Sequence, residues 1–175
     1  LGFLDCGENC RHVSDGAVLR NGFALIHTVS ANTLEAAGGH KACGEAFDCL
    51  SAIQNEDGTY SSGGAKCSES CSWVIVSTTT WGINPDTDSR FIKNGKSVVD
   101  GLLAHYLPDS ATFQHIIGAG SNAMATDQSC YALVAYDRFI NGKTALFDYS
   151  DVTFGAATPS GDEMVATLGL PAEIN

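Results

Sequence analysis

Several ionisable side chains are candidates for metal binding by their type. Asp127 and Cys130 are three residues apart at the start of an apolar segment, so a helix would place both on one face. His105 ends an earlier helical segment, and His115 lies in the loop beyond it. Carboxylate, thiolate and imidazole groups are the ligands that zinc accepts. The alternative, which we favour, is that Asp127 stabilises the first turn of its helix and Cys130 is a small buried residue.

A pair of carboxylates, in Asp86-Thr87-Asp88, is a second candidate for chemistry. Neighbouring carboxyl groups can act as acid and base, but protonating a substrate needs a desolvated carboxyl group with a raised pKa. This pair directly follows Pro85 and a predicted helix end, which is typical of a solvated turn. The sequence shows no Ser-His-Asp order, phosphate-binding glycine loop or pair of glutamates suited to catalysis. We therefore predict no catalytic residues.

Seven cysteines are a high number for a chain of 175 residues. Cys130 stands alone, and the others form three close pairs: Cys6 with Cys10, Cys43 with Cys49, and Cys67 with Cys71. Local pairs of this kind predict disulfides formed in an oxidising compartment. A metal site is the alternative, but two matching pairs at zinc-ligand spacing are absent. We therefore predict three local disulfides, an extracellular or cell-surface location, and no metal or cofactor.

Charge and hydropathy exclude two classes of partner. The net charge of −11, with no cluster of Lys or Arg to offset it, repels nucleic acids and anionic membranes. No apolar run approaches the roughly 20 residues that span a bilayer. The chain is 44% hydrophobic and 17% charged, so it can bury a core. It opens at Leu1 without Met, which is consistent with a leader that has been removed.

Apolar residues at three- and four-residue steps predict five helices, joined by long loops and with no series of strand hairpins. These helices cover about residues 14–33, 41–54, 68–81, 95–106 and 122–141. The segment from Ser68 is ambiguous, since its β-branched residues suit a strand equally well, but Gly82 and Pro85 favour a helix end. Residues 144–152 are predicted to be extended. The predicted fold is all-α, built from antiparallel helical hairpins.

The end of the second predicted helix carries a structural pattern that includes Leu50. The Gln54 side chain can hydrogen-bond to carbonyl groups left open at a helix end. Asp57-Gly58 can form a tight turn, over which Tyr60 can pack. These residues would join neighbouring helical pairs, so their predicted role is structural.

This pattern resembles the repeat of the α/α-toroid superfamily of terpene cyclases and protein prenyltransferases, although Cys49 stands where that repeat has an aromatic residue. Residues 44–152 resemble bacterial extracellular surface proteins with prenyltransferase-like repeats, through strings such as residues 81–106 and 124–152. Similar barrels occur in the cobalamin carriers transcobalamin and intrinsic factor. The resemblance implies one toroid domain over residues 1–152, best supported over 43–152, with 153–175 as a weakly structured tail. It also implies secretion and no assigned catalysis.

Enzymes of the same superfamily supply an alternative function. Class II terpene cyclases use an Asp-x-Asp-Asp acid; Asp86 and Asp88 match two of its positions, and Ser89 replaces the last. Protein prenyltransferases hold zinc with Asp, Cys and His, and the spacing of Asp127 and Cys130 differs from theirs by one residue. Isoprenoid processing is therefore the less favoured interpretation.

The favoured function is a secreted, non-catalytic binding or structural module. A cell-surface or small-molecule ligand would meet a fringe formed by Trp81, His105, His115 and Asp127. Five helices are about half of what a closed toroid needs, so we expect self-association through open helical faces, as a dimer or an extracellular filament. The large apolar residues assigned to those faces are Trp73, Val74, Val76, Trp81, Leu102 and Tyr106.

Overall fold

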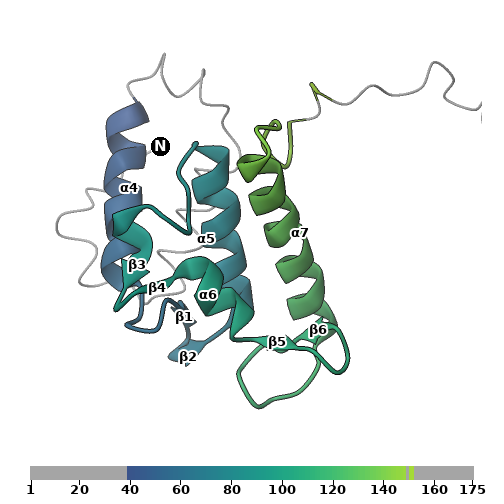
Figure 1. Ribbon diagram of the computed structural model, residues 1–175. Coiled ribbons are helices and arrows are strands. Elements are labelled where there is room, and N and C mark those ends of the chain that lie inside the picture. The colour runs from purple at the N-terminus through teal and green to yellow at the C-terminus, as the bar shows by residue number, and fades with distance from the viewer. Residues whose placement is uncertain (1–38, 149, 152–175) are drawn as a thin grey trace, which may run out of the picture.

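The computed structural model describes residues 39–148, 150 and 151, with only the backbone for residues 39–43 and 45. The predicted helix over residues 14–33, Cys6, Cys10 and the predicted tail lie outside these residues. The described part contains four α-helices: α4 (Gly39–Ile53), α5 (Ser68–Thr80), α6 (Val98–Leu103) and α7 (Ala123–Ile140). In Figure 1, α5 lies between α4 and α7, and the short helix α6 packs against α5.

A two-stranded antiparallel hairpin precedes each of the last three helices. β1 (Ser61–Ser62) and β2 (Ala65–Lys66) come before α5; β3 (Ile92–Lys93) and β4 (Lys96–Ser97) come before α6; β5 (Tyr106–Leu107) and β6 (Thr112–Phe113) come before α7. A 3-10 helix, Ser89–Phe91, leads into β3. The described chain therefore repeats a unit of hairpin and helix.

These hairpins show that the all-α prediction is wrong. Each strand has 2 residues, which is too short for the alternation of apolar and polar residues that reveals a strand. The missed signal lies in the turns. Asn94-Gly95 joins β3 to β4, Gly63-Gly64 joins β1 to β2, and all of these residues have positive φ. Such pairs are what two-residue hairpin turns require.

The predicted helix over residues 95–106 is shorter in the structure because strands border it on both sides. Ser97 ends β4 and also caps α6, since its Oγ accepts a hydrogen bond from Asp100 N and its own N donates to Asp100 Oδ2, each at 3.0 Å. Beyond α6, Tyr106 pairs with Phe113 in the β5–β6 hairpin. The capping box thus fixes the first turn of a helix that has only 6 residues.

The ambiguous segment from Ser68 is a helix, α5, and most of its side chains are buried. The hydroxyl groups of Thr78, Thr79 and Thr80 donate to carbonyl oxygens four residues earlier, at 2.8, 2.8 and 2.7 Å. Because these polar groups are satisfied within the helix, a threonine-rich segment can lie in the interior of the protein. A helix that is buried on all sides need not show one apolar face, which explains the ambiguity of its sequence.

Small residues allow α7 to pack along α5. The buried side chains of α7 recur at three- and four-residue steps, and they are Ala125, Ser129, Ala132 and Ala135. Asn122 caps the helix, because its side chain accepts a hydrogen bond from Ala125 N at 2.9 Å. Among the described residues, no helix has both the length and the apolar character that crossing a membrane requires.

The apolar core joins all four helices to the loops between them. Its buried members include Phe47, Leu50, Tyr60, Cys71, Val74, Ile75, Val76, Phe91, Val98, Leu102 and Phe113. Val74, Val76 and Leu102, which the sequence analysis assigns to an open helical face, therefore lie inside. Trp73 and Trp81 pack against the edge of the core. The predicted apolar surface for self-association is correspondingly reduced.

The segment predicted to be extended, residues 144–152, contains turns and no strand where the structure describes it. Arg138 of α7 stabilises this arrangement. Its guanidinium group donates to Thr144 O at 2.9 Å and pairs with Asp151 at 2.8 Å. The segment therefore folds back on the end of α7.

Candidate functional site

The residues of the predicted structural pattern lie together where α4 ends. The buried Gln54 side chain donates from Nε2 to Gly58 O at 3.1 Å and to Phe91 O at 3.0 Å. Tyr60, which has no exposed surface, donates from its hydroxyl group to Leu50 O at 2.9 Å. The turn after α4 is thus bonded to α4 itself and to the 3-10 helix before β3. These contacts fit a structural role. The Gln54 side chain bonds to carbonyl groups of the following turn and of the 3-10 helix, however, and not to the open carbonyl groups of α4.

Two glycines allow this turn to lie against the start of α6. Gly58 has a φ of +82°, and a Cβ placed there would lie 2.2 Å from Ser97 O. A Cβ on Gly101 would lie 2.5 Å from Gly58 O. Only glycine fits either position without movement of the backbone.

Asp57 fixes the same turn from the outside. Its Oδ1 accepts hydrogen bonds from Thr59 N and Oγ1, and its Oδ2 pairs with Lys66 at 2.6 Å. Burial raises the pKa of this carboxyl group, but the hydrogen bonds from Lys66 and Thr59 outweigh burial and lower it to about 2. Asp57 is therefore ionised across the physiological range and acts as an acceptor.

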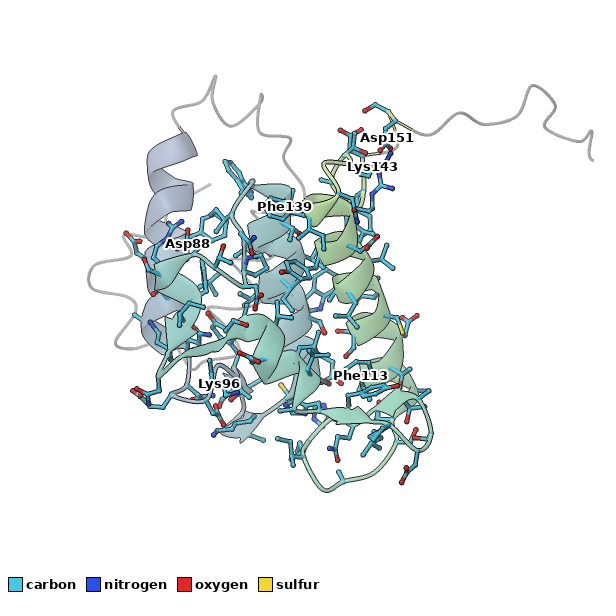
Figure 2. All side chains as sticks on the ribbon, in the orientation of Figure 1. Asp88, Lys96, Phe113, Phe139, Lys143 and Asp151 are labelled. Carbon is cyan, nitrogen blue, oxygen red and sulfur yellow. The ribbon has the colours of Figure 1, made fainter. Side chains whose placement is uncertain are left out.

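The carboxylates of the Asp-x-Asp string also bond to structural partners. Asp86 accepts from Ser97 Oγ at 2.6 Å and from Tyr136 OH at 3.3 Å. Asp88 accepts from Arg90 N and forms an ion pair with its guanidinium group at 2.9 Å. The hydrogen bond from Arg90 lowers the pKa of Asp88. Figure 2 shows Asp88 beside α4, away from α7. The partners of Asp88 favour its ionised form, so this carboxylate is poorly suited to donate a proton as an acid.

The cysteines depart from the predicted pairing. Cys67 and Cys71 are both free and buried, so the predicted bridge between them is wrong. Cys67 Sγ lies 3.0 Å from Ser70 Oγ, and burial raises the pKa of the Cys71 thiol to about 12. Both thiols are therefore buried, and neither forms a disulfide.

Cys49 is disulfide-bonded. Cys6, Cys10 and the side chain of Cys43, which take part in the other two predicted bridges, lie outside the described residues. Cys130 is free and exposed, so its predicted burial is wrong. It follows the buried Ser129 by one residue and so points away from the face of α7 that packs on α5.

Three of the four predicted fringe residues gather at the N-terminal end of α5, where Glu69 lies in the first turn. His115 Nδ1 lies 2.7 Å from Glu69 Oε2. His105 is fully buried and close enough to be influenced by the charges of Glu69 and His115. Asp127 is exposed on α7, and its charge, like that of Glu69, acts on Tyr131. Burial, followed by these two charges, raises the pKa of Tyr131 to about 12.

An aromatic pair completes this cluster. The ring centroids of Trp73 on α5 and Tyr131 on α7 are 5.4 Å apart, with an interplanar angle of 58°. Trp73 Nε1 donates to Gln128 Oε1 at 3.0 Å. We call the following residues the α5–α7 site: Glu69, Trp73, His115, Asp127, Gln128 and Tyr131. The aromatic pair is absent from the predicted fringe, although Tyr131 follows Asp127 by four residues and so shares its helical face.

Trp81 does not belong to the α5–α7 site. It caps the opposite end of α5, with its ring centroid 6.3 Å from that of Phe47. A helix of 13 residues is about 20 Å long, so Trp81 and Glu69 are well separated.

One buried polar atom of the site, Glu69 Oε1, has no hydrogen-bond partner among the described residues. Burial lowers the pKa of His105, which therefore favours the neutral imidazole. In the part of the chain that the structure describes, no three His, Cys, Asp or Glu side chains are arranged to hold a metal ion.

Comparison with family models, curated proteins and solved structures found no match for this chain. The resemblance to toroid proteins therefore stays a prediction from its sequence motifs.

Proposed function

We propose that this chain is a secreted or cell-surface module that binds a ligand at the α5–α7 site and performs no catalysis. The strongest support is the difference between the carboxylates that hold the fold together and those that lie at the α5–α7 site. Asp86 and Asp88, the candidates for acid catalysis, stabilise turns and helix starts. Glu69, His115 and Asp127 instead lie beside an aromatic pair at the surface. A small number of polar groups next to aromatic side chains is typical of ligand sites.

The extracellular part of the proposal is supported by the disulfide at Cys49. Disulfides persist in oxidising compartments and are rare in reducing ones. Intact-mass measurement of protein purified without reductant tests it. We expect a mass lower by two hydrogen atoms for each disulfide, and a fully reduced mass would contradict the extracellular assignment.

Binding can be tested without knowing the ligand. A melting-temperature screen would use cationic, anionic and neutral small molecules, since a ligand that binds the folded state stabilises it. We expect at least one class to raise the melting temperature, with the shift lost in Tyr131→Leu and kept in Tyr131→Phe. A shift that is equal in both variants, or no shift with any class, would contradict the proposal. Product formed from an isoprenyl diphosphate would support the enzyme alternative instead.

Self-association is a second candidate, favoured by exposed large apolar side chains. Those around the β5–β6 hairpin and the start of α7 are Leu103, Tyr106, Ile116, Ile117 and Met124, with exposed fractions of 38% to 58%. Groups of this kind mark interaction surfaces when they are contiguous. The net charge of −11 opposes close contact, so salt should strengthen the association. Light scattering at low and high salt tests it, and a monomer under both conditions would remove this candidate.

A further inference from the structure

We propose that the α5–α7 site binds a small alkylammonium compound, with the ammonium group on the Tyr131 ring between Asp127 and Glu69. The inference rests on the binding function proposed above and names the chemical class of its ligand.

The aromatic surface is held in place by both helices. Trp73 and Tyr131 are each partly buried, so their rings are anchored in the α5–α7 contact and still reach the surface. The hydrogen bond from Trp73 Nε1 to Gln128 Oε1 fixes the orientation of the indole ring. A cation near the face of Tyr or Trp is attracted by the ring quadrupole. The Tyr131 ring, held against Trp73, therefore offers a preformed surface for a cation.

Two carboxylates give this surface a negative potential. Asp127 precedes Tyr131 by four residues on α7, and Glu69 precedes Trp73 by four on α5, so each carboxylate shares a helical face with one of the two paired rings. Burial, followed by the charges of Asp127 and Glu69, raises the pKa of the Tyr131 hydroxyl group. An anion would be repelled at the same place, so charge complementarity selects a cation.

Glu69 has capacity for a further hydrogen-bond donor. Its Oε2 is engaged with His115 Nδ1 at 2.7 Å and with Ser68 Oγ at 3.2 Å. Its Oε1 is buried and has no partner. A buried carboxylate oxygen without a donor is unfavourable, and an ammonium N–H group would remove that cost once movement of the neighbouring side chains uncovers the oxygen. This is why a ligand with N–H donors is preferred to a quaternary ammonium ion.

The α7 helix also provides a place for an alkyl chain. Met124 precedes Asp127 by three residues and Tyr131 by seven, so all three lie on one face of the helix. Met124 is 58% exposed. An alkyl chain of a few carbons bound at Tyr131 can extend along this face and cover the methionine side chain. The combination selects a cation with a short apolar chain.

Tryptophan fluorescence can report binding at the site directly. The chain has two tryptophans, so the Trp81→Phe variant leaves Trp73 as the reporter. Titration with n-butylammonium should give a saturable change, with a dissociation constant of about 1 mM for so small a ligand. n-Butanol has the same shape without the charge, and we expect no saturation with it. Equal responses to the two compounds would overturn the inference.

Matched variants, made in the same background, separate the charge from the ring. Asp127→Asn should weaken binding about threefold, whereas Asp48→Asn, which makes the same change at an exposed position of α4, should leave it unchanged. Tyr131→Leu should weaken binding about fivefold, and Tyr131→Phe should preserve it. Unchanged binding in Asp127→Asn, which alters only an exposed side chain, would contradict the assignment. A lysine peptide that binds tenfold more tightly than n-butylammonium would overturn the choice of a small molecule.

The outcomes also distinguish this inference from the proposed function. An anionic or neutral compound that binds in a Tyr131-dependent way would keep the binding function and reject the cation. Absence of binding by all three classes would reject both.

Discussion

Among the described glycines, Gly58 is the one at which an added side chain would meet its neighbour most closely. Its φ is positive, and a Cβ at this position would lie only 2.2 Å from Ser97 O, so any side chain must displace α6. We expect Gly58→Ala to lower the free energy of unfolding by about 3 kcal/mol or more, from backbone strain and the clash together. Urea denaturation measures this loss.

Gly63→Ala is the matched control for Gly58→Ala. Gly63 also has a positive φ, of +60°, but nothing lies within 4 Å of the position of its Cβ. Gly63→Ala should lower the free energy of unfolding by only about 1 kcal/mol, from backbone strain. Tyr60→Phe should also cost about 1 kcal/mol, because it removes the hydrogen bond to Leu50 O and keeps the ring. Equal losses for Gly58→Ala and Gly63→Ala would contradict the contact with α6.

His105 should make stability depend on pH. Burial lowers the pKa of its imidazole in the folded state, and a backbone hydrogen bond with Gln114 and the charge of Glu69 oppose only part of this shift. As the pH falls below about 6.5, the unfolded chain takes up a proton that the folded state holds poorly, so acid reduces stability. The slope from this one group is at most about 1.4 kcal/mol per pH unit.

Urea unfolding at about pH 7.5 and about pH 5.5 tests the role of His105. The loss of stability on acidification should be smaller in His105→Leu than in the unaltered protein. Asp57 does not interfere, because its lowered pKa of about 2 places its own contribution at much more acidic pH. Parallel pH profiles for the two proteins would show that His105 is not responsible.

Among the elements, α6 depends most on its cap. It has 6 residues, so the capping box of Ser97 and Asp100 serves a large share of its backbone groups. Ser97 Oγ also donates to Asp86 Oδ1 at 2.6 Å. Ser97→Ala should therefore lower the free energy of unfolding by about 2 kcal/mol, at the upper end for a cap. Ser110→Ala, at an exposed loop position, should change it little, and equal effects would argue against the cap.

The long helices could be predicted from sequence because each has a clear stop or a clear apolar period. α4 and α7 match their predicted segments to within two residues, and Gly82 marks the end of α5. The hairpins could not be found from periodicity, since their strands have 2 residues each. Their signal was local, in Asn94-Gly95, whose positive φ angles suit a hairpin turn.

The candidate site was harder to predict because it depends on tertiary contacts. His105, His115 and Asp127 were found as loop and helix-end residues with ionisable groups, and the structure places them near one another. The predicted grouping of Trp81 with these residues is wrong, because the length of α5 separates Trp81 from the α5–α7 site. The pairing of Trp73 with Tyr131 joins residues 58 positions apart, and no local pattern encodes it.

At the scale of the whole molecule, burial should control which thiols react. Cys130 is exposed, whereas Cys67 and Cys71 are 3% and 0% exposed. Alkylation of the native protein should therefore modify Cys130 first, and Cys67 and Cys71 only after the protein opens. Peptide mapping after brief treatment with iodoacetamide measures the order, and treatment in urea provides the control in which all three react. Modification of Cys71 as fast as Cys130 in the native protein would mean that α5 is not buried. A peptide in which Cys67 and Cys71 are joined by a disulfide would contradict the free thiols of the structure.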